Sequence, residues 1–240
     1  MTLDDILKSL FASDHGVTPE GAILTGKASL ADGQAIHVLG FTGGQELGID
    51  DACTLARHVL AIARSEDATP LLFLVDSSSQ RMSRRDELMG LSEFLSHLAK
   101  SLLLAEQTGH RTIGLLYGGS TAGALIATAF ACGTLVALPG AHPAVMDLAS
   151  MSRVTKLSVE LLTEKAQATP VFAPGLDNLA LTGAIHQTWD PDKPLDAQLS
   201  ALLATPFAGD TRALLGRGRG GRLKAADIAD RVVALAQAHG

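Results

Sequence analysis

The sequence is poor in aromatic residues, which make up only 4% of the chain, although 47% of its residues are hydrophobic. Its core must therefore be built from Leu, Ala, Val and Ile, and closely packed helices are expected. The chain contains only two cysteines, Cys53 and Cys132, and they form no CxxC motif. Its eight histidines are scattered singly. These absences argue against a metal centre and a redox pair, and we expect no metal ligands.

Positive charge is also scarce, since the formal net charge is −6 and the isoelectric point is near 5.7. A surface that binds nucleic acid or an anionic membrane would need a basic excess, so neither partner is expected. No apolar run reaches the length of a membrane span, and the N-terminus is acidic where a signal peptide would be basic. We therefore expect a cytoplasmic protein. Residues 1–240 are expected to form one domain, with a helical part from about residue 147.

Three common catalytic or nucleotide-binding motifs are missing. No Gly-Lys-Ser/Thr phosphate loop occurs, and no GxGxxG follows a predicted strand. The segment 118–123 resembles the serine elbow GxSxG, but Gly123 comes one position too late. A serine hydrolase based on Ser120 is therefore a minor alternative.

Strand and helix patterns alternate along the chain. Apolar runs at 22–30 and 34–41, joined by a glycine turn, predict a hairpin. A continuous apolar run at 70–75 predicts a strand buried on both faces, followed by a polar loop over 76–87 and a long helix to about residue 107. The next predicted strand, 111–117, leads to a second loop. This order is typical of an α/β fold, in which ligands collect at loops that follow parallel strands.

The most informative segment is the glycine turn after that strand. Gly118 and Gly119 lack side chains, and the helix that follows begins with unpaired N–H groups. Such a turn is able to donate two hydrogen bonds to a developing oxyanion. An Ala-rich helix is predicted over 122–131, and its small side chains suit close approach to another chain. We therefore expect an obligate hetero-oligomer.

Arginines cluster at two places. Arg81, Arg84 and Arg85 follow the strand that ends near Val75, where guanidinium groups are able to bind a carboxylate or phosphate, or simply to face solvent at a helix start. The segment 216–222 carries three further arginines among four glycines. It is interpreted either as a mobile basic loop or as a segment that grips a phosphate or an acidic partner.

Three runs together resemble a known family. These are residues 109–124 with Tyr117-Gly-Gly-Ser120, residues 146–155 and residues 179–186. The hairpin start, the repeated βα units and the glycine turn resemble the crotonase superfamily and its carboxyltransferase branch. The fuller likeness is to the gamma subunit of biotin-independent malonate decarboxylase, and it covers nearly the whole chain. The implied fold is α/β, a superhelix of ββα units with a C-terminal helical layer.

The resemblance implies a carbon–carbon lyase. Together with a related beta subunit, the chain would convert a malonyl thioester on an acyl carrier protein to the acetyl thioester and CO2. An alpha acyltransferase subunit would belong to the same complex. The resemblance also implies backbone amides of Gly119 and Ser120 as the oxyanion site, with Gly118 shaping the turn. Substrate-binding roles would fall to Gln80, Arg81, Thr121 and Ala122. The chain would bind no cofactor and no biotin, only the CoA or phosphopantetheine arm of its substrate.

Two alternatives stay open. A self-sufficient crotonase-fold acyl-CoA hydratase or hydrolase would need a Glu or Asp pair near the turn, whereas Glu87, Glu93, Glu160 and Glu164 lie away from it in sequence. A non-catalytic scaffold subunit would only cover its partner. Assay of the chain alone and with a partner would separate these possibilities.

Overall fold

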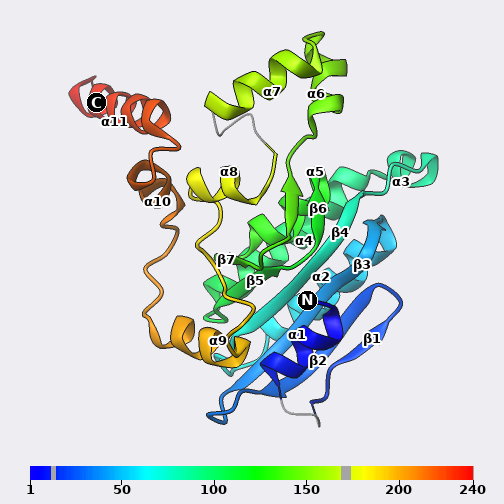
Figure 1. The fold of residues 1–240 in the computed structure, drawn as a ribbon. Helices are drawn as coiled ribbons and strands as arrows, with labels where there is room; N and C mark the ends of the chain where they lie inside the picture. Colours follow the sequence, from blue (N-terminus) through cyan, green and yellow to red (C-terminus); the bar gives the residue numbers. More distant parts are fainter. Residues whose placement is uncertain (12–14, 169–173, 240) are drawn as a thin grey trace.

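The fold is built on a seven-stranded sheet with strand order β1-β2-β3-β4-β5-β7-β9 (Figure 1). The computed structural model describes residues 1–11, 15–168 and 174–239. The strands of the large sheet are β1 Thr18–Glu20, β2 Ile23–Ser29, β3 Ala35–Leu47, β4 Leu71–Gln80, β5 Thr112–Leu116, β7 Thr134–Ala137 and β9 Gln187–Thr188. Two short strands, β6 Gly119–Thr121 and β8 His142–Ala144, pair with each other in a second sheet.

Helices cover both faces of the sheet and extend beyond it (Figure 1). Their bounds are α1 Leu3–Leu10, α2 Ile49–Ala63, α3 Arg84–Met89, α4 Leu91–Gln107, α5 Ala122–Ala127, α6 Leu148–Thr155, α7 Val159–Ala168, α8 Leu176–Leu181, α9 Leu195–Ala204, α10 Arg212–Gly218 and α11 Leu223–His239, with a 3-10 turn at Ala129–Ala131. In the described part of the chain, no helix is both long and apolar enough to cross a membrane.

The predicted hairpin is confirmed, β1 also pairs antiparallel with β2, and the sheet from β3 onward is parallel. Strands β2 and β3 pair antiparallel, whereas β3, β4, β5, β7 and β9 pair parallel in succession. All parallel strands therefore present their carboxyl ends at the same edge. Loops that are far apart in the sequence meet there.

The apolar run of β4 is buried on both faces, as its composition predicts. Leu71, Phe73 and Val75 lie in a core shared with α2 and α4. Leu72 and Leu74 lie in a second core on the other face, shared with α1 and α9. Each fully buried side chain of this size contributes about 1.5–3 kcal/mol to folding.

The expected loop 76–87 is wrong over its first half, because β4 continues to Gln80. Its extension pairs with an equally extended β3, where Gln45 lies opposite Ser77 and Leu47 opposite Gln80. The register shifts between these pairs, so the strands bulge. The bulged pairing keeps the polar segment in strand conformation.

Two predicted helices are shorter than expected. The helix to residue 107 is interrupted at Gly90, whose φ of 87° ends α3 and begins α4. The small-residue helix ends at Ala127. The Thr128 hydroxyl donates a hydrogen bond to the Ala124 carbonyl at 2.6 Å, and the backbone of Thr128 is not helical. This helix packs against α4 and β4 within the chain. Its small side chains therefore serve packing within the chain on one face, whereas Ile126 on the same helix is 51% exposed.

The segment 216–222 is not an open basic loop. Gly216 lies inside α10, and Arg217 forms ion pairs with Asp230 at 2.9 Å and Asp227 at 3.7 Å. Arg219 donates to three backbone carbonyls, including that of Ile185 at 2.6 Å. These arginines hold the C-terminal helices together.

Candidate active site at the glycine turn

The carboxyl-terminal halves of β3 and β4 and the end of β5 form one polar cluster. Thr42 and Gly43 come from β3, Asp76 from β4, and Tyr117 and Gly118 follow β5. All five line a depression of about 410 Å³ beside α1. Ligands of parallel α/β sheets bind at this edge, where loops of neighbouring strands converge. The depression is therefore the candidate ligand site.

The end of β4 is attached to the glycine turn by four hydrogen bonds, each between residues 43 apart. The Gly119 N–H donates to Asp76 Oδ1 at 3.0 Å, and the hydroxyls of Ser77 and Ser120 lie 2.8 Å apart. The remaining two are the Thr121 hydroxyl to the Ser78 carbonyl at 2.6 Å and the Gly123 N–H to Gln80 Oε1 at 2.9 Å. This row of contacts fixes the turn against a buried strand.

The turn is in part a strand. Gly119–Thr121 form β6, which pairs with β8 so that Gly119 lies opposite His142 and Ser120 opposite Pro143. Helix α5 starts directly afterwards at Ala122, whose φ of 49° is unusual for a residue with a side chain. The expected arrangement, an open turn leading straight into a helix, is therefore wrong.

The two glycines at the turn are required by close approach. A Cβ at Gly118 would lie 2.0 Å from Asp76 Oδ1, and one at Gly119 would lie 2.8 Å from the Ser77 carbonyl oxygen and 2.9 Å from His142 Nε2. No side chain fits at either position without moving these groups. The same distances show that the Asp76 carboxylate and the His142 ring lie directly against the turn.

The backbone donors of the turn differ in their availability. The Gly118 N–H has no hydrogen-bond partner in the part of the chain that the structure describes. The Gly119 N–H already donates to the Asp76 carboxylate. A ligand oxygen therefore has to displace that carboxylate before it can accept from Gly119. Ser120 is fully buried within β6. Of these donors, the Gly118 N–H is the one without a partner among the described residues, and Gly118 lines the depression.

Ser120 has the wrong surroundings for a nucleophile. Its side chain is fully buried and its hydroxyl meets the Ser77 hydroxyl, not a histidine. A catalytic serine needs a base within hydrogen-bond reach. The geometry therefore speaks against the serine-hydrolase alternative.

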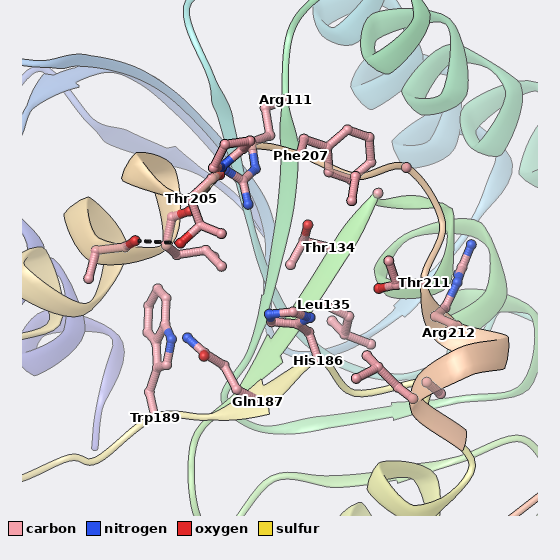
Figure 2. Close-up of a pocket in the computed structure, with 18 of the residues that line it drawn as sticks. Arg111, Thr134, Leu135, His186, Gln187, Trp189, Thr205, Phe207, Thr211 and Arg212 are labelled. Carbon is pink, nitrogen blue, oxygen red and sulfur yellow. Dashed lines mark hydrogen bonds between the residues drawn. The ribbon is translucent and has the colours of Figure 1, made fainter. Parts of the chain in front are cut away.

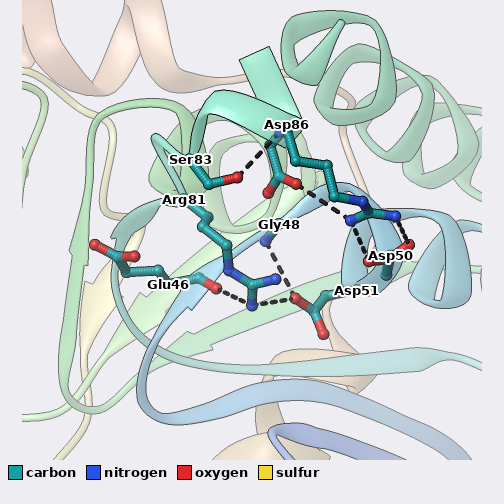
Figure 3. Close-up of polar contacts among 8 residues, drawn as sticks. Glu46, Gly48, Asp50, Asp51, Arg81, Ser83 and Asp86 are labelled. Carbon is teal, nitrogen blue, oxygen red and sulfur yellow. Dashed lines mark hydrogen bonds and ion pairs between the residues drawn. The ribbon is translucent and has the colours of Figure 1, made fainter. Parts of the chain in front are cut away.

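The arginines after β4 have acidic partners outside the depression (Figure 3). Arg81 Nη2 contacts Asp51 Oδ2 at 3.0 Å and the Glu46 carbonyl at 3.1 Å. Arg85 contacts Asp50 at 2.6 Å, and this hydrogen bond lowers the pKa of the Asp50 carboxyl group. Both arginines connect the segment after β4 to the start of α2.

Tyr117 and Asp76 were not among the predicted site residues. Burial, followed by the nearby charge of Asp76, raises the pKa of the Tyr117 phenol, which therefore stays protonated at neutral pH. The available signal was positional: Asp76 and Tyr117 each follow the apolar run of a parallel strand. The depression thus has an acidic side chain, a neutral phenol and a free amide.

This fold is similar to that of the crotonase-fold carboxyltransferases. Chains of the transcarboxylase 12S hexamer match with a TM-score of 0.67 at 17% identity, over 84% of this chain and 39% of theirs. At this identity the likeness concerns the fold alone.

The chain belongs to the malonate decarboxylase gamma subunit family, whose pattern matches residues 42–236. It is similar to a chain of a Pseudomonas malonate decarboxylase hetero-tetramer solved in complex with coenzyme A. That match has 26% identity and a TM-score of 0.79, and covers 97% of this chain and 98% of the other. A chain of a Pseudomonas malonate decarboxylase MdcD-MdcE hetero-dimer matches at 25% identity with a TM-score of 0.73. The match covers 96% of this chain and 96% of that chain.

A curated relative points to carboxyl transfer. The malonyl-S-ACP:biotin-protein carboxyltransferase MADD of Malonomonas rubra is 25% identical over 200 residues, which is 74% of this chain and 68% of that protein. Together these relatives support a catalytic role in decarboxylation or carboxyl transfer.

Proposed function

We propose that this chain, acting as one domain in a cytoplasmic complex with a related beta subunit, decarboxylates a malonyl thioester to an acetyl thioester and CO2. The observation that carries the proposal is the N–H of Gly118, a residue that lines the depression, which has no partner among the described residues and adjoins the Gly119 N–H that donates to Asp76. Two such amides suit an oxygen on which negative charge develops.

The proposed reaction breaks the bond between the carboxylate carbon and the α-carbon. CO2 leaves, and the bonding electron pair moves onto the thioester oxygen as an enolate, whose carbon then takes a proton. Backbone donors aimed at that oxygen are worth about 3–4 kcal/mol each in comparable sites. We assign one donor to Gly118 and the second to Gly119 once Asp76 gives up its hydrogen bond. This changes the initial expectation, which placed the donors on Gly119 and Ser120.

The remaining site residues are proposed to position the turn. Gln80 Oε1 accepts from the Gly123 N–H at the start of α5, and the Thr121 hydroxyl holds the Ser78 carbonyl. Ala122 keeps the left-handed backbone that connects β6 to α5. Arg81 acts through Asp51 by holding the segment after β4, because its Nη2 already has two acceptors.

The proposed substrate is carried on the phosphopantetheine arm of an acyl carrier protein, and an alpha acyltransferase subunit loads it. The names of the relatives support these partners, since one is a hetero-tetramer in complex with coenzyme A and another acts on malonyl-S-ACP. Exposed apolar side chains support a hetero-oligomer: Leu214 on α10 is 73% exposed, and Ile228 on α11 is 63% exposed. Such residues are candidates for burial against a partner.

A second candidate function is carboxyl transfer to a biotin protein, which the name of the Malonomonas relative favours. We propose the biotin-independent reaction for this chain. The two are separated by co-expressing the chain with its beta subunit and supplying carboxyl-labelled malonyl thioester, with and without excess avidin. Release of labelled CO2 that is insensitive to avidin supports the proposal, whereas label appearing on a biotin acceptor rejects it. Equal turnover by this chain alone would favour the self-sufficient hydratase or hydrolase class.

A further inference from the structure

A second cavity, of about 450 Å³, is shown in Figure 2. It is lined by Arg111, which precedes β5, and so lies at the opposite end of that strand from the glycine turn. Arg111 precedes β5 and Gly118 follows it, so about 3.3 Å per strand residue puts them roughly 20 Å apart. No residue that lines this cavity belongs to the depression at the turn. It is a separate site of a size that suits a small molecule.

The cavity is lined by basic side chains and by no acidic one, in a chain whose net charge is −6. Its lining contains Arg111, Arg212 and His186 but no aspartate or glutamate. Arg212 is compensated by Asp210 at 2.7 Å, just outside the lining. Among the described residues, Arg111 has no carboxylate within 4.0 Å, and its Nη1 donates instead to backbone carbonyls, among them Leu202 at 2.9 Å and Thr205 at 2.7 Å. Among the described residues Arg111 therefore has no ion-pair partner, and the acid whose charge acts on it from a longer distance is Glu106.

The acid closest along the chain is engaged elsewhere. Glu106 Oε2 accepts from the Thr112 N–H at 2.7 Å and also contacts the Thr112 hydroxyl. It does not line the cavity. An anion that enters would thus meet Arg111 without competition from a carboxylate in the wall.

Two buried donors of the lining lack acceptors. Trp189 is only 2% exposed, and in the described part of the chain neither its indole Nε1 nor Arg111 Nε has a hydrogen-bond partner. An unsatisfied buried N–H is unfavourable, so it is normally paired once an acceptor is available. Phe207, whose ring centroid lies 5.7 Å from Arg111 Cζ, adds an apolar wall opposite the indole (Figure 2).

We propose that this cavity binds a small organic anion, with its carboxylate or phosphate oxygens on Arg111 and its carbon skeleton against Trp189 and Phe207. The site does not depend on the proposed decarboxylation. It would allow a small acid to be bound at the end of β5 opposite the glycine turn.

Trp189 is the only tryptophan of the chain, so its fluorescence reports on the cavity directly. The full-length chain is titrated with acetate, malonate or phosphate, and with sodium chloride at matched ionic strength. We expect a saturable change in emission with one class of oxyanion and none with chloride. Saturation by the two carboxylates identifies a carboxylate site, and saturation by phosphate alone identifies a phosphate site. A linear response equal to that of chloride would overturn the proposal.

Variants test the assignment to Arg111. Arg111→Gln is expected to weaken binding at least tenfold, since a hydrogen bond to a charged group is lost. Arg85→Gln removes the same charge at an ion pair on the start of α2 and is expected to bind as the wild type does. Because Arg111 also holds the end of α9, Trp189→Phe is measured in parallel by calorimetry. Wild-type affinity in Trp189→Phe and in any folded Arg111→Gln would reject the site.

Discussion

The hydroxyl oxygens of Ser77 and Ser120 lie 2.8 Å apart in a site where both side chains are buried. This pair joins the end of β4 to the middle of β6. Ser120 resembles a nucleophile in sequence, but this contact gives it a structural role in joining two strands. The contact also predicts how the protein responds when one hydroxyl is removed.

Ser120→Ala should cost stability and leave the chemistry largely intact. It leaves the buried Ser77 hydroxyl without its partner, which costs about 1–3 kcal/mol, whereas the proposed donors are backbone amides. Urea unfolding should show this loss, and turnover of the assembled complex should stay within about threefold of wild type. The double variant Ser77→Ala/Ser120→Ala removes both polar groups and should be less destabilised than the sum of the singles. An inactive but folded Ser120→Ala complex would revive the nucleophile hypothesis.

Gly119→Val should abolish turnover while leaving assembly with the beta subunit nearly intact. A side chain at Gly119 would meet the Ser77 carbonyl and the His142 ring, so the amides move away from the substrate oxygen. Loss of one such donor lowers kcat by about 10²–10³-fold. Gly218→Ala is the matched control, because its added Cβ meets nothing within 4 Å. Turnover above a tenth of wild type in an assembled Gly119→Val complex would contradict the assignment.

Arg81 and Asp51 should behave as a single unit. If Arg81 acts by holding the segment after β4, then Arg81→Gln and Asp51→Asn should have similar effects, and their combination should add little. The stability change should be small, about 0.5 kcal/mol, because the Arg81 side chain is 38% exposed and water screens the pair. A rise in KM on Arg81→Gln that Asp51→Asn does not reproduce would instead mean that Arg81 binds the substrate carboxylate.

The sheet could be predicted from the sequence because its signals are local. The apolar run ending at Val75 and the hairpin turn at Gly33 each determine a strand by burial or by backbone geometry. The glycine turn was located for the same reason. Its small residues are adjacent in the chain and follow an apolar run.

The sequence could not show which backbone N–H groups of the turn already have an acceptor, because this depends on contacts between segments 43 residues apart. Whether the Gly119 amide is free is decided by the position of Asp76, and that position depends on how far the bulged pairing of β3 and β4 extends. Likewise, Arg81 looked available for substrate because Asp51 lies 30 residues away in the sequence. Local patterns identify donors, but only the fold shows which donors already have acceptors.

Stability should fall as the pH is lowered through the range in which His37 titrates. Burial, followed by the charge of Lys27, lowers the pKa of His37 below its usual value, against an opposing effect of Asp67. The unfolded chain then binds a proton near pH 6.5 that the folded chain takes up only at lower pH. The His37 contribution is therefore complete above about pH 6.5 and is lost as the pH falls toward the folded-state pKa. His186, whose pKa burial also lowers, contributes in the same direction.

Urea unfolding of the full chain at several pH values between about 7.5 and 5 measures this dependence. His37→Gln should flatten the curve in that window, because the group that takes up the proton is gone. His97→Gln, at an exposed position on α4, is the control and should leave the slope unchanged. A His37→Gln curve as steep as that of the wild type would show that other groups control the acid sensitivity.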